Sequence, residues 1–127
     1  MSPRIAVIDD EPIILDLLYE LLSEEGYAPH VFIDGNRAWP HLRALAPHAI
    51  ILDLRVGPRG GAGQDVLARL RHDLVLHATP VILCSADLPA RPAHGNAVLA
   101  PGCALLPKPF DLNDLLPVVR ALTGGPS

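Results

Sequence analysis

Short apolar runs that stop abruptly at a polar residue are the feature that most constrains the fold of this chain. Four consecutive apolar residues stand directly before a polar one at three places: residues 5–8 before Asp9, 49–52 before Asp53, and 81–84 before Ser85. A strand that is buried on both faces reads as such a continuous apolar run. The pattern predicts a parallel sheet whose two faces are both covered by helices.

Segments with helical periodicity alternate with these runs. Pro12 opens the first helix, and Gly26 ends it. Its predicted buried face consists of Ile14, Leu17, Leu18, Leu21 and Leu22. Further helices are expected at 37–45, 64–71 and 112–122, and further strands at 28–33 and 103–106. Asp111 is expected to cap the last helix, and Pro117 to bend it.

The segment from Asp87 to Pro101 is rich in proline and glycine, so only a short or irregular helix is expected there. Five strands then alternate with five helical segments. This order predicts an α/β fold with a parallel sheet and, because crossovers are right-handed, helices on both faces. We expect a single domain over residues 1–127, with a core at about 4–122 and a tail at 123–127.

Composition excludes several classes of protein. The chain has 127 residues, half of them hydrophobic, and a net charge of −4. These values favour one folded domain and argue against binding nucleic acid through a basic surface. No apolar stretch is long enough for a membrane span, so a cytoplasmic location is expected. Cys84 and Cys103 stand in apolar runs and are expected to be buried thiols rather than a disulfide.

The carboxyl ends of parallel strands lie along one edge of the sheet, where such folds place their sites. Three carboxylates (Asp9, Asp10 and Asp53), the Ser85 hydroxyl and the Lys108 amine are therefore expected to converge. Clustered carboxylates repel one another unless cations offset them. Lys108 supplies one charge, and a divalent cation such as Mg²⁺, or Mn²⁺, would supply the rest. A carboxylate nucleophile, Mg²⁺ and a lysine together indicate phosphoryl transfer to aspartate.

Each residue alone has a plainer interpretation. Asp9, Asp10 and Glu11 could be acids favoured by a helix dipole, Asp53 could be a turn residue, Ser85 a cap, and Lys108 a solvated charge. The combination of these residues is what indicates phosphoryl transfer, because each of them lies at or just after the carboxyl end of its own strand.

The sequence resembles the receiver domain of two-component response regulators, of the stand-alone, chemotaxis-regulator type. Four stretches, within a likeness that covers about residues 4–122, carry the resemblance: 4–12 (RIAVIDDEP), 50–54 (IILDL), 79–86 (TPVILCSA) and 106–110 (LPKPF). The resemblance implies a flavodoxin-like, doubly wound sheet of five parallel strands in the order 2-1-3-4-5.

The resemblance also implies residue roles. Asp53 would accept the phosphoryl group. The metal would be held directly by Asp10, through water by Asp9, and also by Asp53 and the backbone carbonyl of Arg55. Ser85 would bind the phosphoryl group, and Lys108 would pair with one of its oxygens. The Lys108–Pro109 bond would be cis. Such a domain is a Mg²⁺-dependent switch that phosphorylates and dephosphorylates itself, rather than an enzyme acting on other molecules.

The chain departs from the family pattern in three places. The glycine-rich loop 56–63 is about two residues longer than usual. Leu105 stands where the family often has the Tyr or Phe that moves inward on phosphorylation. The proline-rich segment 87–101 replaces the usual fourth helix, which belongs to the family's output surface, so a standard dimer through that helix is not expected.

Two finer hypotheses follow. Arg55 and Asp87 lie two residues beyond Asp53 and Ser85, so a contact between them would slow self-dephosphorylation; the alternative is two solvated side chains. Ile13 is the apolar residue on the polar side of the first helix. We expect it to be exposed and to contact the phosphodonor, the alternative being partial burial under the loop after Lys108.

Expected partners are a sensor histidine kinase or a histidine phosphotransfer protein, and a downstream target protein. No direct contact with nucleic acid or membrane is expected, and the chain should be a monomer or weak dimer.

Competing functions are an aspartate-nucleophile phosphatase, a binding module that has lost phosphorylation, and a receiver cut from a multidomain regulator. The phosphatase pattern, two acids separated by one residue after the first strand, is missing here. A zinc site is not expected from the six scattered histidines, of which His72 and His77 have the wrong spacing.

Overall fold

A computed structural model describes residues 2–53, 62–85, 98–100, 103–107 and 111–125. The strands are β1 (Arg4–Ile8), β2 (Ala28–Phe32), β3 (Ala49–Asp53), β4 (Val81–Ser85), β5 (Val98–Ala100) and β6 (Cys103–Pro107). The helices are α1 (Pro12–Glu24), α2 (Gly35–Leu45), α3 (Ala62–Arg71) and α4 (Leu112–Thr123). None of the helices in these ranges is long and apolar enough to cross a membrane.

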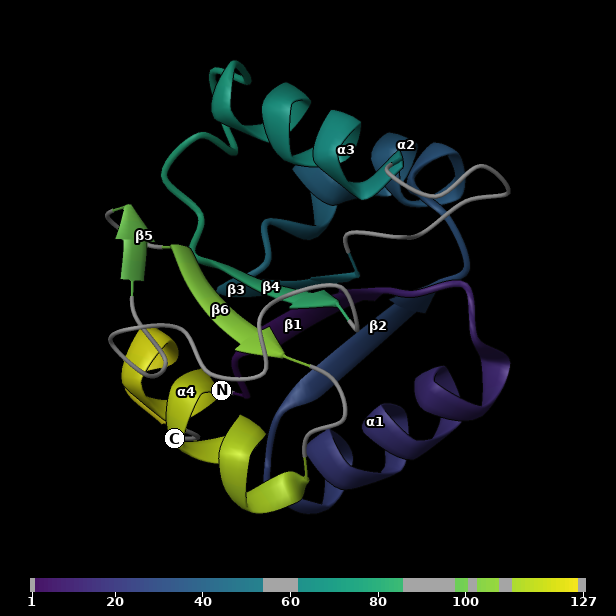
Figure 1. The fold of residues 1–127 in the computed structure, drawn as a ribbon, viewed down its shortest axis with the longest axis vertical. Helices are drawn as coiled ribbons and strands as arrows, with labels where there is room; N and C mark the ends of the chain where they lie inside the picture. The colour runs from purple at the N-terminus through teal and green to yellow at the C-terminus, as the bar shows by residue number, and fades with distance from the viewer. Residues whose placement is uncertain (1, 54–61, 86–97, 101–102, 108–110, 126–127) are drawn as a thin grey trace.

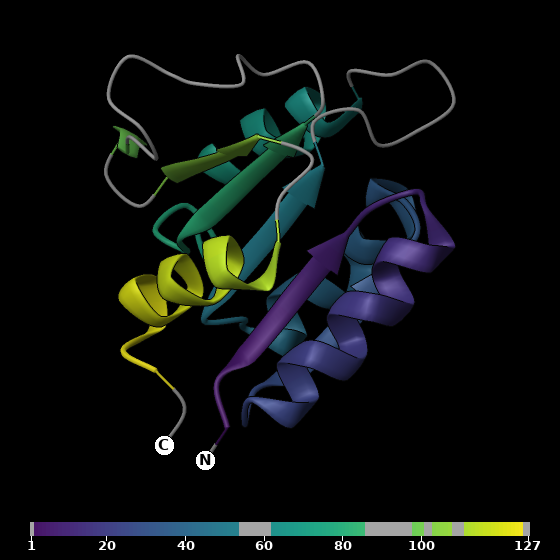
Figure 2. The same cartoon turned by 60° about the horizontal axis from the view of Figure 1, so that its bottom comes forward.

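One sheet organises the molecule, with its strands in the order β2-β1-β3-β4-β6-β5. The strands β2, β1, β3, β4 and β6 pair in parallel, which confirms the predicted order 2-1-3-4-5 of the five parallel strands. Helices α1 and α4 cover one face of the sheet, and α2 and α3 cover the other (Figures 1 and 2). This is the doubly wound α/β architecture that the alternating pattern predicts.

The edge strand β5 was not predicted. It pairs with β6 in antiparallel orientation, with an irregular register between Val98 and Ala100. The proline-rich segment for which we expected a short or irregular helix therefore ends in a strand. Residues 86–97, where that helix would lie, are outside the described residues.

Each central strand contributes to two separate cores because successive side chains point to opposite faces. Ile5, Val7 and Ile51 pack in the core beneath α1 and α4. Ala6, Ile8 and Ile50 pack in the core beneath α2 and α3. Every residue of β3 is buried, and so is every residue of β1 after Arg4. Burial on both faces explains the uninterrupted apolar runs in the sequence.

Helix α1 begins at Pro12 as expected, but its buried face is rotated from the predicted one. Leu15 is buried, whereas Leu17, which was placed on the inner face, is 48% exposed. The helix carries more apolar residues than one face can hold, and contact with the sheet selects the side that includes Leu15. Ile13 is 81% exposed, which confirms the predicted exposure of that side chain.

Side chains at the helix ends satisfy the free backbone groups there. Asp34 accepts a hydrogen bond from the Arg37 N–H at the start of α2, which therefore begins two residues earlier than expected. Asp111 and Asp114 form a reciprocal capping box at α4, confirming the predicted cap. Gly124 ends α4 in the left-handed conformation that glycine adopts without strain. The bend at Pro117 stays a prediction.

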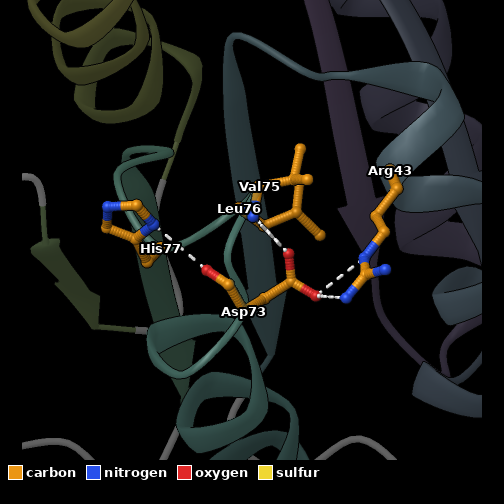
Figure 3. Close-up of polar contacts among 5 residues, drawn as sticks. All are labelled: Arg43, Asp73, Val75, Leu76 and His77. Carbon is orange, nitrogen blue, oxygen red and sulfur yellow. Dashed lines mark hydrogen bonds and ion pairs between the residues drawn. The ribbon is translucent and has the colours of Figure 1, made fainter.

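A buried aspartate fixes the turn between α3 and β4, and nothing in the sequence had singled it out. Asp73 Oδ2 accepts two hydrogen bonds from the Arg43 guanidinium, at 2.6 and 2.8 Å. Its Oδ1 accepts the backbone N–H groups of Val75 and Leu76, and the Nδ1 of His77 lies 3.1 Å from its backbone oxygen (Figure 3). The carboxylate thus ties α2 to the turn that leads into β4.

The Arg43 hydrogen bond lowers the pKa of Asp73 from 3.8 to about 2, assisted by the two backbone donors and opposed by burial. A depressed pKa means that the ionised carboxylate stabilises the fold above its ordinary pKa, and that this contribution disappears as the pH falls toward 2.

Substituting Asp73→Asn should therefore lower the urea midpoint at neutral pH, because the charged partner of Arg43 is lost. The difference from the wild type should shrink as the pH falls from about 4 to about 2. Urea denaturation at several pH values measures both effects. Asp65→Asn, an exposed acid on α3, is the matched control. A midpoint difference that stays constant over this range would contradict the assignment.

Candidate metal centre

The register of β1 and β3 brings two acidic strand ends side by side. Ile8 pairs with Leu52 at the last step of the parallel ladder, and the next residues along the two strands are Asp9 and Asp53. The Asp9 N–H donates to the Phe32 carbonyl, which extends the pairing toward β2 by one residue. Asp9 and Asp53 are 4% and 5% exposed. Two acids 44 positions apart in the sequence are therefore neighbours at the carboxyl edge of the sheet.

Four carboxylates gather at this edge. One oxygen from each of Asp9, Asp10, Glu11 and Asp53 lies within 4.8 Å of the others. The predicted cluster of Asp9, Asp10 and Asp53 is confirmed as a group. Glu11 joins it and was not assigned as a ligand from the sequence, although it directly follows the acidic pair. Asp9 and Asp53 form the buried floor of the group, and Asp10 and Glu11 form its exposed rim.

A local turn holds the rim over the floor. Asp9 Oδ1 accepts the Glu11 backbone N–H at 2.9 Å. Glu11 is the N-cap of α1, and Pro12 occupies the first helical turn, where its missing N–H leaves no lost hydrogen bond. The hydrogen bond of Asp9 thereby fixes the turn between β1 and α1. Asp10 and Glu11 lie in this turn, beside the buried carboxylates.

This arrangement concentrates negative charge. Two ionised carboxylates at the upper limit of these separations, 4.8 Å, would repel by roughly 3 kcal/mol at an effective dielectric of ~20. Solvent reduces this repulsion for the exposed pair, Asp10 and Glu11. The donor set contains only hard carboxylate oxygens, with no histidine or cysteine of the described residues among them. Oxygen ligands suit Mg²⁺ or Mn²⁺ rather than zinc, which prefers nitrogen and sulfur. The residues present fit a divalent cation of this class.

Further strand ends reach the same edge. Asp53 pairs with Cys84, so β4 extends one residue beyond this step, to Ser85, and Ser85 pairs with Pro107 at the end of β6. Lys108 directly follows Pro107, but it lies outside the described residues, as do Arg55, Asp87 and Pro109. The backbone of Ser85 thus stands where the sequence predicts it. The expected contacts of these other residues are not tested.

Three other residues named from the sequence lie in the core. Leu105 is buried in the core beneath α2 and α3. Cys84 and Cys103 are buried and are not joined in a disulfide, as the sequence predicts.

Comparison with known proteins identifies the family. The family sequence model of the response regulator receiver domain matches residues 5–120 of this chain. The chain belongs to the response regulator receiver family. This receiver domain therefore has the fold and the two-component signalling role that the motifs around Asp10, Asp53 and Lys108 predicted.

Curated relatives are longer proteins. The transcriptional regulatory protein TcrA of Mycobacterium tuberculosis is 36% identical over 123 residues, which cover 94% of this receiver domain and 46% of TcrA. The DNA-binding dual master transcriptional regulator RpaA of Synechocystis is 35% identical over 120 residues, covering 94% of the receiver domain and 48% of RpaA. The receiver domain thus spans about half the length of these relatives.

Solved structures share the fold. The receiver domain of the sensor histidine kinase PA1611 from Pseudomonas aeruginosa, with a magnesium ion coordinated in its active site cleft, aligns with a TM-score of 0.80 at 19% identity. That alignment covers 98% of this chain and all of the other. The receiver domain of Francisella response regulator 1452 aligns with a TM-score of 0.80 at 26% identity, covering 97% and 98% of the two chains.

The mutual repulsion of the four carboxylates can be tested by measuring stability in the absence of metal. Asp10→Asn removes one charge from the exposed rim and should raise the stability of the metal-free receiver domain, by on the order of 1 kcal/mol. Added Mg²⁺ should stabilise the wild type more than the variant, because only the wild type keeps all four carboxylates. Urea denaturation in EDTA and in Mg²⁺ measures both effects.

Asp16→Asn is the matched control for this test, since Asp16 is an exposed acid on α1 outside the cluster. Equal effects of the two substitutions would show that net charge, rather than the cluster, sets the stability.

Proposed function

We propose that Asp53 accepts a phosphoryl group from a phosphohistidine of a sensor kinase or phosphotransfer protein, with a divalent cation held by Asp9, Asp10 and Asp53. The observation that carries this proposal is the meeting of Asp53 with the acidic pair at the carboxyl edge of the sheet. The family match over residues 5–120 supports it.

The chemistry is a displacement at phosphorus. A carboxylate oxygen of Asp53 forms a P–O bond as the P–N bond of the donor imidazole breaks, and the imidazole leaves with the electron pair and takes up a proton. Hydrolysis of the acyl phosphate by water later restores the Asp53 carboxylate and releases inorganic phosphate. A bound Mg²⁺ would offset the negative charge of the phosphoryl oxygens and of the surrounding carboxylates.

Each residue of the site would have its own role. Asp9, buried and oriented by the Glu11 N–H, keeps the floor of the site in place. Ser85 would donate its hydroxyl hydrogen to the bound phosphoryl group, Lys108 would pair with a phosphoryl oxygen, and the Arg55 carbonyl would complete the metal ligands. An Arg55–Asp87 contact across the mouth of the site would keep water from the acyl phosphate and lengthen its lifetime.

Signalling would follow as a population shift. Moving a two-state equilibrium from 1:99 to 99:1 takes about 5.5 kcal/mol of differential binding. Hydrogen bonds to charged groups contribute ~1.5–3 kcal/mol each, so those from Ser85 and Lys108 provide free energy of this scale. Leu105 is already buried. We therefore place the switch in the segments around Ser85 and Lys108, rather than in an aromatic residue that moves inward.

We further propose that residues 1–127 form one receiver unit that signals by protein contact. A binding module that no longer accepts phosphate is the second candidate. The long glycine-rich loop 56–63 and the absence of an aromatic residue at position 105 favour it.

Incubation with acetyl phosphate, followed by intact-mass measurement, separates these two functions. The wild type should gain one phosphoryl group in Mg²⁺ and none in EDTA, and Asp53→Asn should gain none in either. No gain by the wild type under any condition would support the phosphate-independent module. A gain by Asp53→Asn would show that another residue is the acceptor.

The exposed residue Ile13 should contact the phosphodonor, since it lies three residues beyond Asp10 on the helix that leaves the acidic site. Ile13→Asp should slow transfer from the cognate kinase or phosphotransfer protein about tenfold, as expected when a contact residue costs more than 1 kcal/mol. Transfer from acetyl phosphate should not change. Rates from both donors measure this, and Tyr19→Asp, half-exposed on another side of α1, is the control. An equal loss with both donors would contradict the docking role.

A further inference from the structure

The outer surface of α1 combines exposed apolar residues with a row of acids. Ile13, Leu17, Glu20 and Glu24 follow one another at helical spacings of four and three residues, and Asp16 lies beside them; all five are exposed, and we call this set the α1 stripe. Residues 5–29 contain seven of the 14 acidic residues of the chain and no lysine, arginine or histidine. The α1 stripe is therefore apolar in part and uniformly negative.

The turn after α3 presents a second exposed apolar pair. Leu74 is 89% exposed and Val75 is 57% exposed; we call these two residues the 74–75 knob. The knob is held in a defined shape, because Asp73 accepts the Val75 N–H and is itself fixed by Arg43 from α2 (Figure 3). A rigid base lowers the entropy lost when such a turn binds a partner.

Basic side chains lie beside the knob. Arg43 has an exposed guanidinium on one side of Asp73, and His77 lies on the other (Figure 3). The Nη1 group of Arg71 donates to the His77 carbonyl at 2.9 Å, and no described carboxylate forms an ion pair with this arginine. Arg69, exposed at the last turn of α3, stacks its guanidinium over the Trp39 ring of α2, 3.9 Å from the ring centroid. Arg43 and Arg71 outnumber the carboxylate of Asp73, so the described residues of this turn and its contacts carry a net positive charge.

We propose that the 74–75 knob of one copy of this chain docks on the α1 stripe of a second copy. Leu74 and Val75 would cover Ile13 and Leu17, while the arginines around the knob would face Asp16, Glu20 and Glu24. Both halves of the contact are present on one chain, with matching apolar pairs and opposite charges. A second copy is therefore the occupant that the observations favour.

The geometry makes this contact head-to-tail. In Figure 1 the turn that follows α3 lies at the upper left, and α1 lies at the lower right on the other face of the sheet. Two different surfaces on opposite sides of a molecule form a heterologous contact, which leaves one free surface at each end of the assembly. The assembly should therefore grow with concentration rather than stop at a dimer. Two apolar side chains on each partner make a small interface, so the association is weak.

The contact would also affect phosphorylation, a consequence that rests on the function proposed above. A neighbour seated on Ile13 would cover the surface assigned to the phosphodonor, so free receiver domain would compete with its own kinase. Self-association itself does not depend on phosphorylation.

Sedimentation velocity in EDTA tests the contact without metal ions that could bridge acidic edges. At about 50 mM salt, the mean mass of the wild type should rise steadily up to about 1 mM protein, and it should fall back toward the monomer at about 500 mM salt because the charges are screened. Ile13→Lys and Leu74→Asp should each prevent the rise. Tyr19→Lys, on another side of α1, should retain it. Circular dichroism confirms that each variant is folded.

A mixture of the two defective variants provides the decisive measurement. Ile13→Lys keeps an intact knob and Leu74→Asp keeps an intact stripe, so the mixture should form a dimer and grow no further. A monomeric wild type up to about 1 mM would overturn the proposal. A mixture that stays monomeric, or a Leu74→Asp variant that still associates alone, would also overturn it.

Discussion

The parallel register between β1 and β3 is the constraint on which the rest of the site depends. Ile8 lies beside Leu52, so the residues that follow them, Asp9 and Asp53, meet at the carboxyl edge of the sheet. The register is stable because both strands are buried on both faces, and a slip of one residue would exchange the side chains of the two cores. The apolar strands thus determine the position of the acids, although they take no part in the chemistry.

Placing two nearly buried carboxylates side by side lowers the free energy of unfolding. Two features of the structure limit this loss of stability. The Glu11 N–H donates to Asp9, and the residues of β1 after Arg4 and all of β3, which lead to Asp9 and Asp53, are buried. The remaining repulsion favours a divalent cation, because a cation binds most strongly where like charges are already held together. The same repulsion that weakens the metal-free domain would therefore favour the divalent cation that the proposed phosphoryl transfer requires.

Much of the fold could be predicted from the sequence because strands buried on both faces leave an unmistakable apolar run, and polar residues mark where they end. The buried face of α1 could not be placed fully, since Leu15 and Leu17 are equally apolar and only packing against the sheet separates them. The three-residue strand β5 lies at the edge of the sheet, where no apolar run is required. The Arg43–Asp73 pair joins residues 30 positions apart, and such contacts leave no local pattern.

The central claim is that Asp9, Asp10 and Asp53 form one divalent-cation site. Titration with Mn²⁺, a paramagnetic substitute for Mg²⁺, observed through the backbone amide signals in an NMR spectrum, tests it most directly. The account predicts that the amide signals of residues 9–11 and 53 broaden first, while those of Leu74 and Val75, at the other end of the molecule, remain sharp. Broadening that starts at other carboxylates, such as Glu24 and Asp65, or that spreads evenly over the acidic surface, would contradict it.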